Sequence, residues 1–93
     1  MNGRGIQHAI DRHTPGGAEN TNASTFNQGE NLRILAQAAE GKTATPQPRG
    51  NFQTIVNAGR DIGIDRATGT ATQTYTVITT AGGRLVTLFP GVP

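Results

Sequence analysis

Two strand-like runs near the C-terminus constrain the fold of this 93-residue chain most strongly. Residues Gln73 to Thr80 (QTYTVITT) are rich in Thr, Tyr, Val and Ile, which suit the pleated, half-buried surface of a strand. The short stretch AGG, Ala81 to Gly83, separates them from a second apolar run, Arg84 to Phe89. We predict that the two runs form a β-hairpin, so any core must be built around this hairpin.

Two helices are predicted ahead of the hairpin. The first spans Ile6 to His13 and stops before Pro15, which disfavours helical geometry at the residue preceding it. The second lies in ENLRILAQAAEG, Glu30 to Gly41, and its closing glycine suits a helix stop. The apolar residues of this second helix recur on one face: Leu32, Leu35, Ala36 and Ala39.

The remaining segments supply loops and short strands. Ala18 to Asn27 is a polar loop pinned by Phe26, and Lys42 to Gly50 is a proline-containing connector that we expect to be extended and mobile. Asn51 to Asn57 and Asp61 to Asp65 alternate weakly and read as strands. The predicted fold class is therefore α+β: two N-terminal helices packed on a small C-terminal antiparallel sheet, in a single domain spanning residues 1–93.

Composition limits the classes of function. Hydrophobic residues make up 33% and aromatic residues 4%, so the core is thin. The chain has no cysteine, which excludes disulfides and thiolate metal sites, and no apolar run long enough to cross a membrane. It also lacks a phosphate-binding glycine loop and a dinucleotide fingerprint, so we expect no cofactor and no membrane partner for the folded chain. The opening MNGRG reads as a start codon joined to a domain excised from a longer secreted protein.

Arginine accounts for seven of the eight cationic side chains. Its rigid fork of donors suits phosphate groups, so this bias points toward nucleic acid, although genome composition explains it equally well. We take two of these arginines and two residues of the predicted hairpin as candidate substrate contacts: Arg60, Arg66, Tyr75 and Thr76.

Both histidines lie in the stretch GIQHAIDRHTPGG. His8 and Arg12 are four residues apart and share a helix face, whereas His13 lies about 140° from His8 on an ideal helix unless the last turn loosens before Pro15. Two imidazoles and a guanidinium are the groups that cleavage of RNA by its own 2′-hydroxyl requires: a base, an acid, and a cation for the charged phosphorane.

Two alternative interpretations of this stretch remain open. His8 and Asp11 are three residues apart and can form a simple surface pair. A zinc site would need Asp11 or a distant acid as a third ligand, and the five-residue separation of the two histidines is wider than a helix normally offers to a metal.

Thr87 is the threonine of the predicted hairpin that most needs an explanation. On its strand, Leu85, Thr87 and Phe89 are expected to alternate with Val86 and Leu88 between the two faces. A hydroxyl amid apolar residues requires a hydrogen-bond partner, and a scissile phosphate can supply one.

Four stretches of the chain carry a resemblance to a known family: HAIDRH, ASTF at Ala23 to Phe26, GIDRATGTATQTYTVIT and the closing RLVTLFPGVP. Together they resemble the C-terminal toxin domains of bacterial contact-dependent growth inhibition proteins and related polymorphic toxins. More narrowly, the chain is similar to their small ribonuclease modules. These have folds of the barnase, EndoU, colicin and RelE group, or of a bacterial branch similar to pancreatic-type ribonuclease. The closing motif resembles the first group, and Phe89 stands where the second group carries a tyrosine.

The resemblance implies roles and partners. His8 or His13 would be the acid/base residue, Arg12 a phosphate contact and Thr87 a phosphate or transition-state ligand. The expected substrate is transfer RNA, with elongation factor Tu as a candidate partner, and a cognate immunity protein, usually acidic, would neutralise the toxin. Delivery from a secreted or cell-surface protein into the cytoplasm of a target cell is also implied.

The leading hypothesis is a metal-independent RNA endonuclease that leaves a 2′,3′-cyclic phosphate. A first alternative is a non-catalytic binding module whose exposed Thr-rich hairpin adds a strand to a partner sheet. A second alternative is a metal-dependent DNA nuclease toxin.

Overall fold

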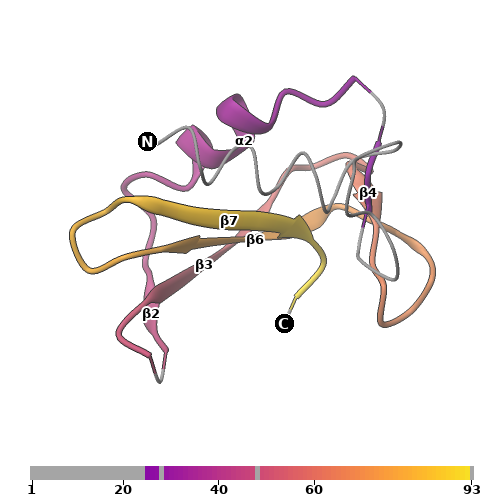
Figure 1. Ribbon diagram of the computed structural model, residues 1–93. Helices are drawn as coiled ribbons and strands as arrows, with labels where there is room; N and C mark the ends of the chain where they lie inside the picture. Colours follow the sequence, from indigo (N-terminus) through magenta and orange to yellow (C-terminus); the bar gives the residue numbers. More distant parts are fainter. Residues whose placement is uncertain (1–24, 28, 48, 93) are drawn as a thin grey trace.

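The computed structural model describes residues 25–27, 29–47 and 49–92. Figure 1 shows a short helix above a twisted antiparallel sheet, with a second, smaller sheet at one end. The elements in chain order are β1 (Thr25–Phe26), α2 (Leu32–Ala38), β2 (Thr45–Pro46), β3 (Phe52–Asn57), β4 (Gly63–Ile64), β5 (Ala71–Thr72), β6 (Thr74–Thr79) and β7 (Leu85–Pro90).

The predicted hairpin is confirmed and forms half of the larger sheet, whose strand order is β2-β3-β6-β7 with every neighbouring pair antiparallel. At the β6–β7 turn, the Gly83 amide donates to the Thr80 carbonyl at 2.9 Å and the Thr80 amide donates to the Arg84 carbonyl at 2.8 Å. Gly83 has a φ of +87°, which a residue with a Cβ rarely adopts, so AGG is suited to close this turn.

The simple alternation predicted for β7 is wrong at its start. Thr79 pairs with Leu85 but the preceding Ile78 pairs with Thr87, so Val86 is an extra residue that bulges out of the ladder. Because neighbouring residues of β6 point to opposite faces, the bulge places Leu85 and Thr87 on opposite faces of the sheet rather than on the same one.

The helix predicted over Glu30 to Gly41 is confirmed as α2, and its four apolar residues are buried as expected. The Asn31 side chain caps its N-terminus by accepting from the amides of Arg33 at 3.1 Å and Ile34 at 3.2 Å. The part of the chain that the structure describes contains this one helix and not two, while the helix predicted at Ile6 to His13 lies outside the described residues.

The smaller sheet has the order β1-β4-β5. Phe26 is fully buried, so it pins its segment as predicted, although the residues around it form a strand and not only a loop. The predicted connector likewise contains a strand, because β2 pairs with β3 through Thr45 and Gln53. Pro46 is tolerated there because β2 is the edge of its sheet.

The core lies between α2 and one face of the larger sheet. It combines the buried helix residues with Phe26, Val56, Ile62, Tyr75, Val77, Leu85 and Leu88. The described domain is therefore α+β, as predicted, with a two-layer arrangement of helix on sheet.

The C-terminal end of β7 is held by contacts around Gly91. The Gly91 amide donates to the Thr74 carbonyl at 2.7 Å, and its carbonyl accepts from the Thr76 hydroxyl at 2.8 Å. The Asp65 side chain fills the space where a side chain of residue 91 would begin, because a Cβ at Gly91 would lie 2.5 Å from the Asp65 Cγ. Asp65 is itself held, since its Oδ1 accepts from the Ala67 amide at 2.9 Å.

Gly91→Ala is expected to lower the free energy of unfolding by more than a matched glycine substitution does. Gly50 has a φ of +81°, close to the +84° of Gly91, but a Cβ there would meet nothing within 4 Å. Gly50→Ala therefore measures the backbone cost alone, about 1–2 kcal/mol, and Gly91→Ala adds the clash with Asp65. Urea denaturation measures both values.

A double-mutant cycle isolates the contact with Asp65. The excess cost of Gly91→Ala should shrink when it is introduced into an Asp65→Ala background, because the clashing carboxylate is then absent. Equal losses for Gly91→Ala and Gly50→Ala would show that Asp65 does not constrain the C-terminal end of β7.

Candidate functional site

The larger sheet has a face that points away from α2, which we call the distal face. Directly paired residues of an antiparallel sheet lie on the same face, so the strand registers identify its members. One row joins Gln53 of β3, Ile78 of β6 and Thr87 of β7. The next row joins Ile55, Thr76 and Phe89.

Thr87 contributes a buried hydroxyl to this face that lacks a hydrogen-bond partner among the described residues. Its Oγ1 atom is buried, and it has no hydrogen-bond partner among the residues that the structure describes. A buried hydroxyl without a partner costs about 1–3 kcal/mol, so a group retained there needs a reason. A ligand oxygen that accepts a hydrogen bond from this hydroxyl would provide one.

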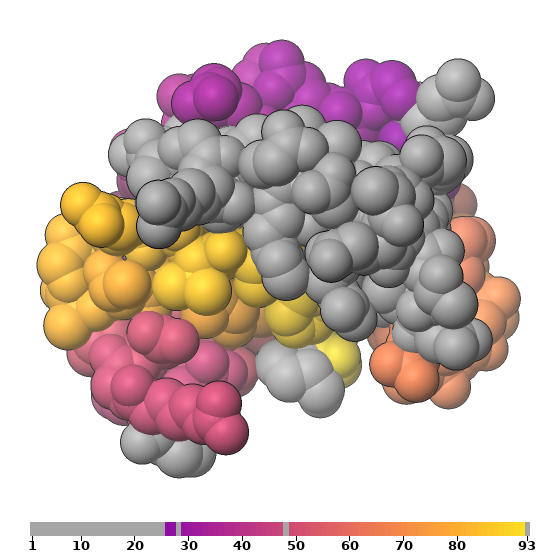
Figure 2. Space-filling view, in the orientation of Figure 1, coloured from indigo at the N-terminus to yellow at the C-terminus, as the bar shows by residue number. Residues whose placement is uncertain are grey.

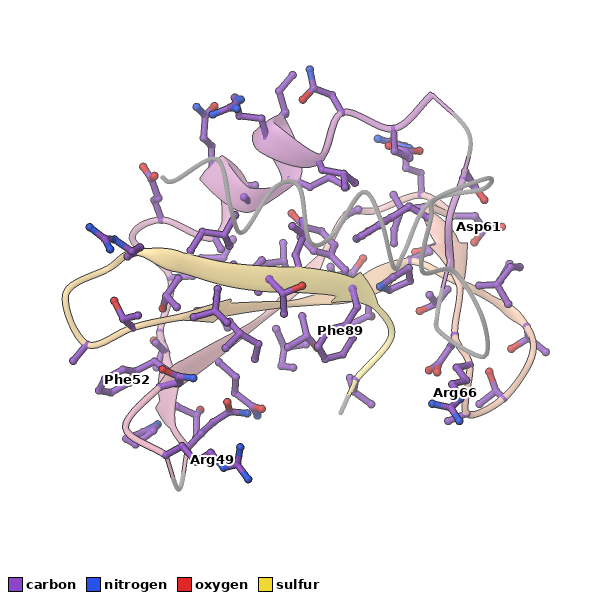
Figure 3. All side chains as sticks on the ribbon, viewed as in Figure 1. Arg49, Phe52, Asp61, Arg66 and Phe89 are labelled. Carbon is purple, nitrogen blue, oxygen red and sulfur yellow. The ribbon has the colours of Figure 1, made fainter. Side chains whose placement is uncertain are left out.

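Phe89 lies two residues after Thr87 on the same face and is partly buried. Figure 3 shows it on the side of β6 and β7 opposite to α2. The two-residue period of the strand predicted that Phe89 shares a face with Thr87, and the register of β7 confirms this part of the alternation.

Tyr75 and Thr76, which we predicted as substrate contacts, are both buried and make hydrogen bonds inside the domain. Tyr75 is 1% exposed, its hydroxyl donates to the Leu35 carbonyl at 2.7 Å, and burial raises the pKa of its phenol. Thr76 is fully buried, and its hydroxyl donates to the Gly91 carbonyl. Both side chains join β6 to other segments of the domain, because each donates a hydrogen bond to a backbone carbonyl distant in the sequence.

Arg60 lies apart from Thr87, on the α2 side. It forms a two-pronged ion pair with Glu30, with Nη1 to Oε2 at 2.5 Å and Nη2 to Oε1 at 2.7 Å. This pairing lowers the pKa of Glu30 and raises that of Arg60. The guanidinium remains largely exposed, with 58% of the side chain accessible, but a phosphate would compete with Glu30 for the same donors.

Arg66 lies in the turn between β4 and β5 and is exposed. Its neighbour Asp65 abuts Gly91, so this turn lies at the C-terminal end of β7, the same end as Phe89. Figure 2 shows that this turn, in orange, and the β6–β7 turn, in gold, lie at opposite ends of the molecule. Figure 3 shows Arg49 and Arg66 well apart, so these two arginines do not share one basic patch.

His8, Arg12 and His13 lie outside the described residues. Their predicted roles therefore stay predictions, as do the alternatives that involve Asp11. Within residues 25–27, 29–47 and 49–92, no three His, Cys, Asp or Glu side chains gather in a metal-binding group. No helix in the same part of the chain is long and apolar enough to span a membrane.

Of the predicted site residues that the structure describes, Thr87 lies on the distal face, Arg66 lies in the turn beside Asp65, and Arg60 pairs with Glu30. No family model and no curated protein matches the chain.

The ion pair between Glu30 and Arg60 predicts how stability depends on pH. The pKa of Glu30 is lower in the folded protein than in the unfolded chain, so its contribution is present at neutral pH and is lost as the pH falls through the folded pKa. Because the pair is partly exposed, the contribution is small and decreases with salt. Glu30→Gln should lower the free energy of unfolding at pH 7. In acid, the free energies of unfolding of Glu30→Gln and of the unsubstituted protein should become equal.

Arg60→Gln is the matched partner variant. It should destabilise more than Glu30→Gln at pH 7, because it leaves the Glu30 carboxylate, whose side chain is only 11% exposed, without its cation. Urea denaturation between pH 3 and about pH 7, which brackets the usual carboxyl range, measures both. A constant difference between Glu30→Gln and the unsubstituted protein across this range would contradict the assignment.

Proposed function

We propose that this domain is a ribonuclease toxin that cleaves RNA, with transfer RNA as the expected substrate. The observation that carries the proposal within the described residues is the buried, unpartnered hydroxyl of Thr87 on the distal face of a small antiparallel sheet. Further support comes from the α+β architecture, which is of the kind that the resemblance to polymorphic toxin ribonucleases implies.

The proposed reaction is an internal transfer that needs no metal. An imidazole of His8 or His13 removes the proton of the ribose 2′-hydroxyl, and the 2′-oxygen forms a bond to phosphorus. The bond from phosphorus to the 5′-oxygen breaks, and the other imidazole protonates that leaving oxygen. Arg12 and the Thr87 hydroxyl stabilise the phosphorane oxygens, and the product is a 2′,3′-cyclic phosphate.

The proposal includes partners and delivery. A cognate acidic immunity protein would cover the site in the producing cell, and elongation factor Tu is a candidate cofactor protein for cleavage. The domain would be delivered from a secreted or cell-surface protein into the cytoplasm of a target cell. The arginine-rich composition suits both RNA and an acidic inhibitor.

The alternative of a binding module has less support. It requires the Thr-rich strand to add to a partner sheet, but β6 pairs with β3 on one side and with β7 on the other. Its backbone groups are therefore already used in ladders, and strand addition would have to occur at β7 or at the β2 edge.

Incubation of the purified domain with total transfer RNA in EDTA tests the proposal. We expect fragments that end in 2′,3′-cyclic phosphates, with elongation factor Tu added in a parallel reaction. Intact RNA in both reactions would refute the proposal, and cleavage of DNA only after a divalent ion is added would favour the DNA nuclease alternative.

Thr87→Val should separate activity from stability. We expect cleavage to fall about a hundredfold or more, the usual cost of removing one transition-state donor, while the free energy of unfolding stays constant or rises because a buried unpartnered hydroxyl is lost. Thr87→Ser should retain cleavage because it keeps the hydroxyl.

Thr45→Val is the matched control for Thr87→Val. Thr45 pairs with Gln53, so it belongs to the same face and row as Thr87 but lies on the opposite edge of the sheet, where it is exposed. Equal activity of Thr87→Val and Thr45→Val would remove Thr87 from the site.

Each histidine is expected to be needed for cleavage. His8→Ala and His13→Ala should each lower the rate by about 10²–10⁴-fold, the usual contribution of general acid or base catalysis, with the larger loss at His13. Circular dichroism should show unchanged secondary structure. Full activity in both variants would place the chemistry elsewhere.

A further inference from the structure

A pocket lies on the other face of the sheet, between the end of α2 and the start of β7. Its volume is about 190 Å³. Ala36 and Ala39 form its wall on the helix side, and Val77 and Leu85 form its apolar floor on the sheet. The two alanines leave this space open because their side chains are too short to reach the sheet.

Two threonine hydroxyls line this apolar pocket. Thr54 of β3 is 5% exposed, and no hydrogen bond joins its hydroxyl to another residue of the described chain. Thr79 of β6 lies on the same face and also lines the pocket. A hydroxyl both donates and accepts, so a buried hydroxyl that faces a cavity without a protein partner is available to a polar ligand.

The rim of the pocket carries charge. Lys42 and Glu40 line it just beyond α2. The Lys42 ammonium can attract an anionic group that remains outside the pocket, and the Glu40 carboxylate can accept a hydrogen bond from a ring N–H.

We propose that this pocket binds the base of a pyrimidine nucleotide. An apolar cavity of about 150 Å³ accommodates one benzene ring, so 190 Å³ suits a single six-membered ring with its exocyclic oxygens and is tight for the two fused rings of a purine. The ring would contact Val77 and Leu85, its polar edge would meet Thr54 and Thr79, and the phosphate would lie near Lys42.

This inference rests on the proposed function, because it makes the pocket a subsite for one base of the RNA. Leu85 in the pocket and Thr87 on the distal face are two residues apart on β7, on either side of the bulge at Val86. Because β7 is the last strand of its sheet, an RNA strand that crosses it can contact both faces. The pocket would then select a pyrimidine near the phosphate held by Thr87.

Titration of the ¹⁵N-labelled domain with uridine 5′-monophosphate, followed by NMR, tests the proposal. We expect saturable shifts of the Thr54, Thr79 and Lys42 amides, and weaker binding of adenosine 5′-monophosphate. Shifts that are absent or that do not saturate would refute the pocket as a nucleotide site, and equal binding of both nucleotides would refute its selection of a pyrimidine.

Two variants assign the binding to this pocket. Ala39→Leu fills the space between α2 and the sheet and should abolish the shifts. Thr54→Val preserves the shape but removes one hydroxyl, so it should weaken binding about threefold to tenfold, whereas the exposed Thr45→Val should leave it unchanged. Binding that survives both pocket variants would refute the assignment.

Failure of this inference is distinguishable from failure of the proposed function. Uridine 5′-monophosphate has no phosphodiester bond to cleave, so its binding is independent of catalysis. Saturable binding without RNA cleavage would retain the pocket and reject the ribonuclease. RNA cleavage without nucleotide binding, and with an unchanged cutting pattern in Thr54→Val, would retain the ribonuclease and reject the pocket.

Discussion

The side chain of Tyr75 joins the layers of this domain. Its hydroxyl donates to the Leu35 carbonyl in the middle of α2 at 2.7 Å, and its ring meets Phe26 of β1 edge to face with centroids 6.4 Å apart. Along the sheet, Tyr75 pairs with Val56 and with Pro90. One residue of the central strand therefore fixes the helix, the smaller sheet and both neighbouring strands, which matters in a chain whose aromatic fraction is only 4%.

This arrangement divides the larger sheet into two surfaces with different chemistry. The face toward α2 holds the core, and short side chains at the end of the helix leave a pocket there. The distal face carries a buried hydroxyl at Thr87 that no described residue satisfies. Gly91 joins two parts of the domain. Its carbonyl accepts a hydrogen bond from Thr76 of β6, and its lack of a side chain leaves room for Asp65, beside the turn that carries Arg66.

Local patterns predicted the regular elements well. The spacing of Leu32, Leu35, Ala36 and Ala39 identified the buried face of α2, and the content of β-branched residues located β6 and β7. The two-residue strands β1, β2 and β5 were not predicted as strands, because two residues have no detectable period. Their pairing depends on partners elsewhere in the chain.

Fewer features of the candidate site followed from local patterns. Thr87 was singled out as a hydroxyl amid apolar residues, and in the structure its buried Oγ1 atom has no partner among the described residues. Tyr75 and Thr76 were predicted as substrate contacts, and alternation alone does not show that both side chains are buried. The ion pair of Arg60 with Glu30 spans 30 residues, and no periodicity connects them. Thr54 was not predicted as a site residue, because it is one of many threonines in the predicted strands. Only the structure shows that the short side chains of α2 lie above it.

The sequence by itself determined the helix α2 with its buried face and the longer strands β3, β6 and β7, since these depend on backbone preferences and on apolar spacing within about ten residues. Only the tertiary structure decided where each hydroxyl lies. The bulge at Val86 turns Leu85 and Thr87 to opposite faces, and the Thr76 hydroxyl donates its hydrogen bond to Gly91, fifteen residues away. Such outcomes follow from strand register and from contacts between distant segments, which are set when the whole sheet assembles.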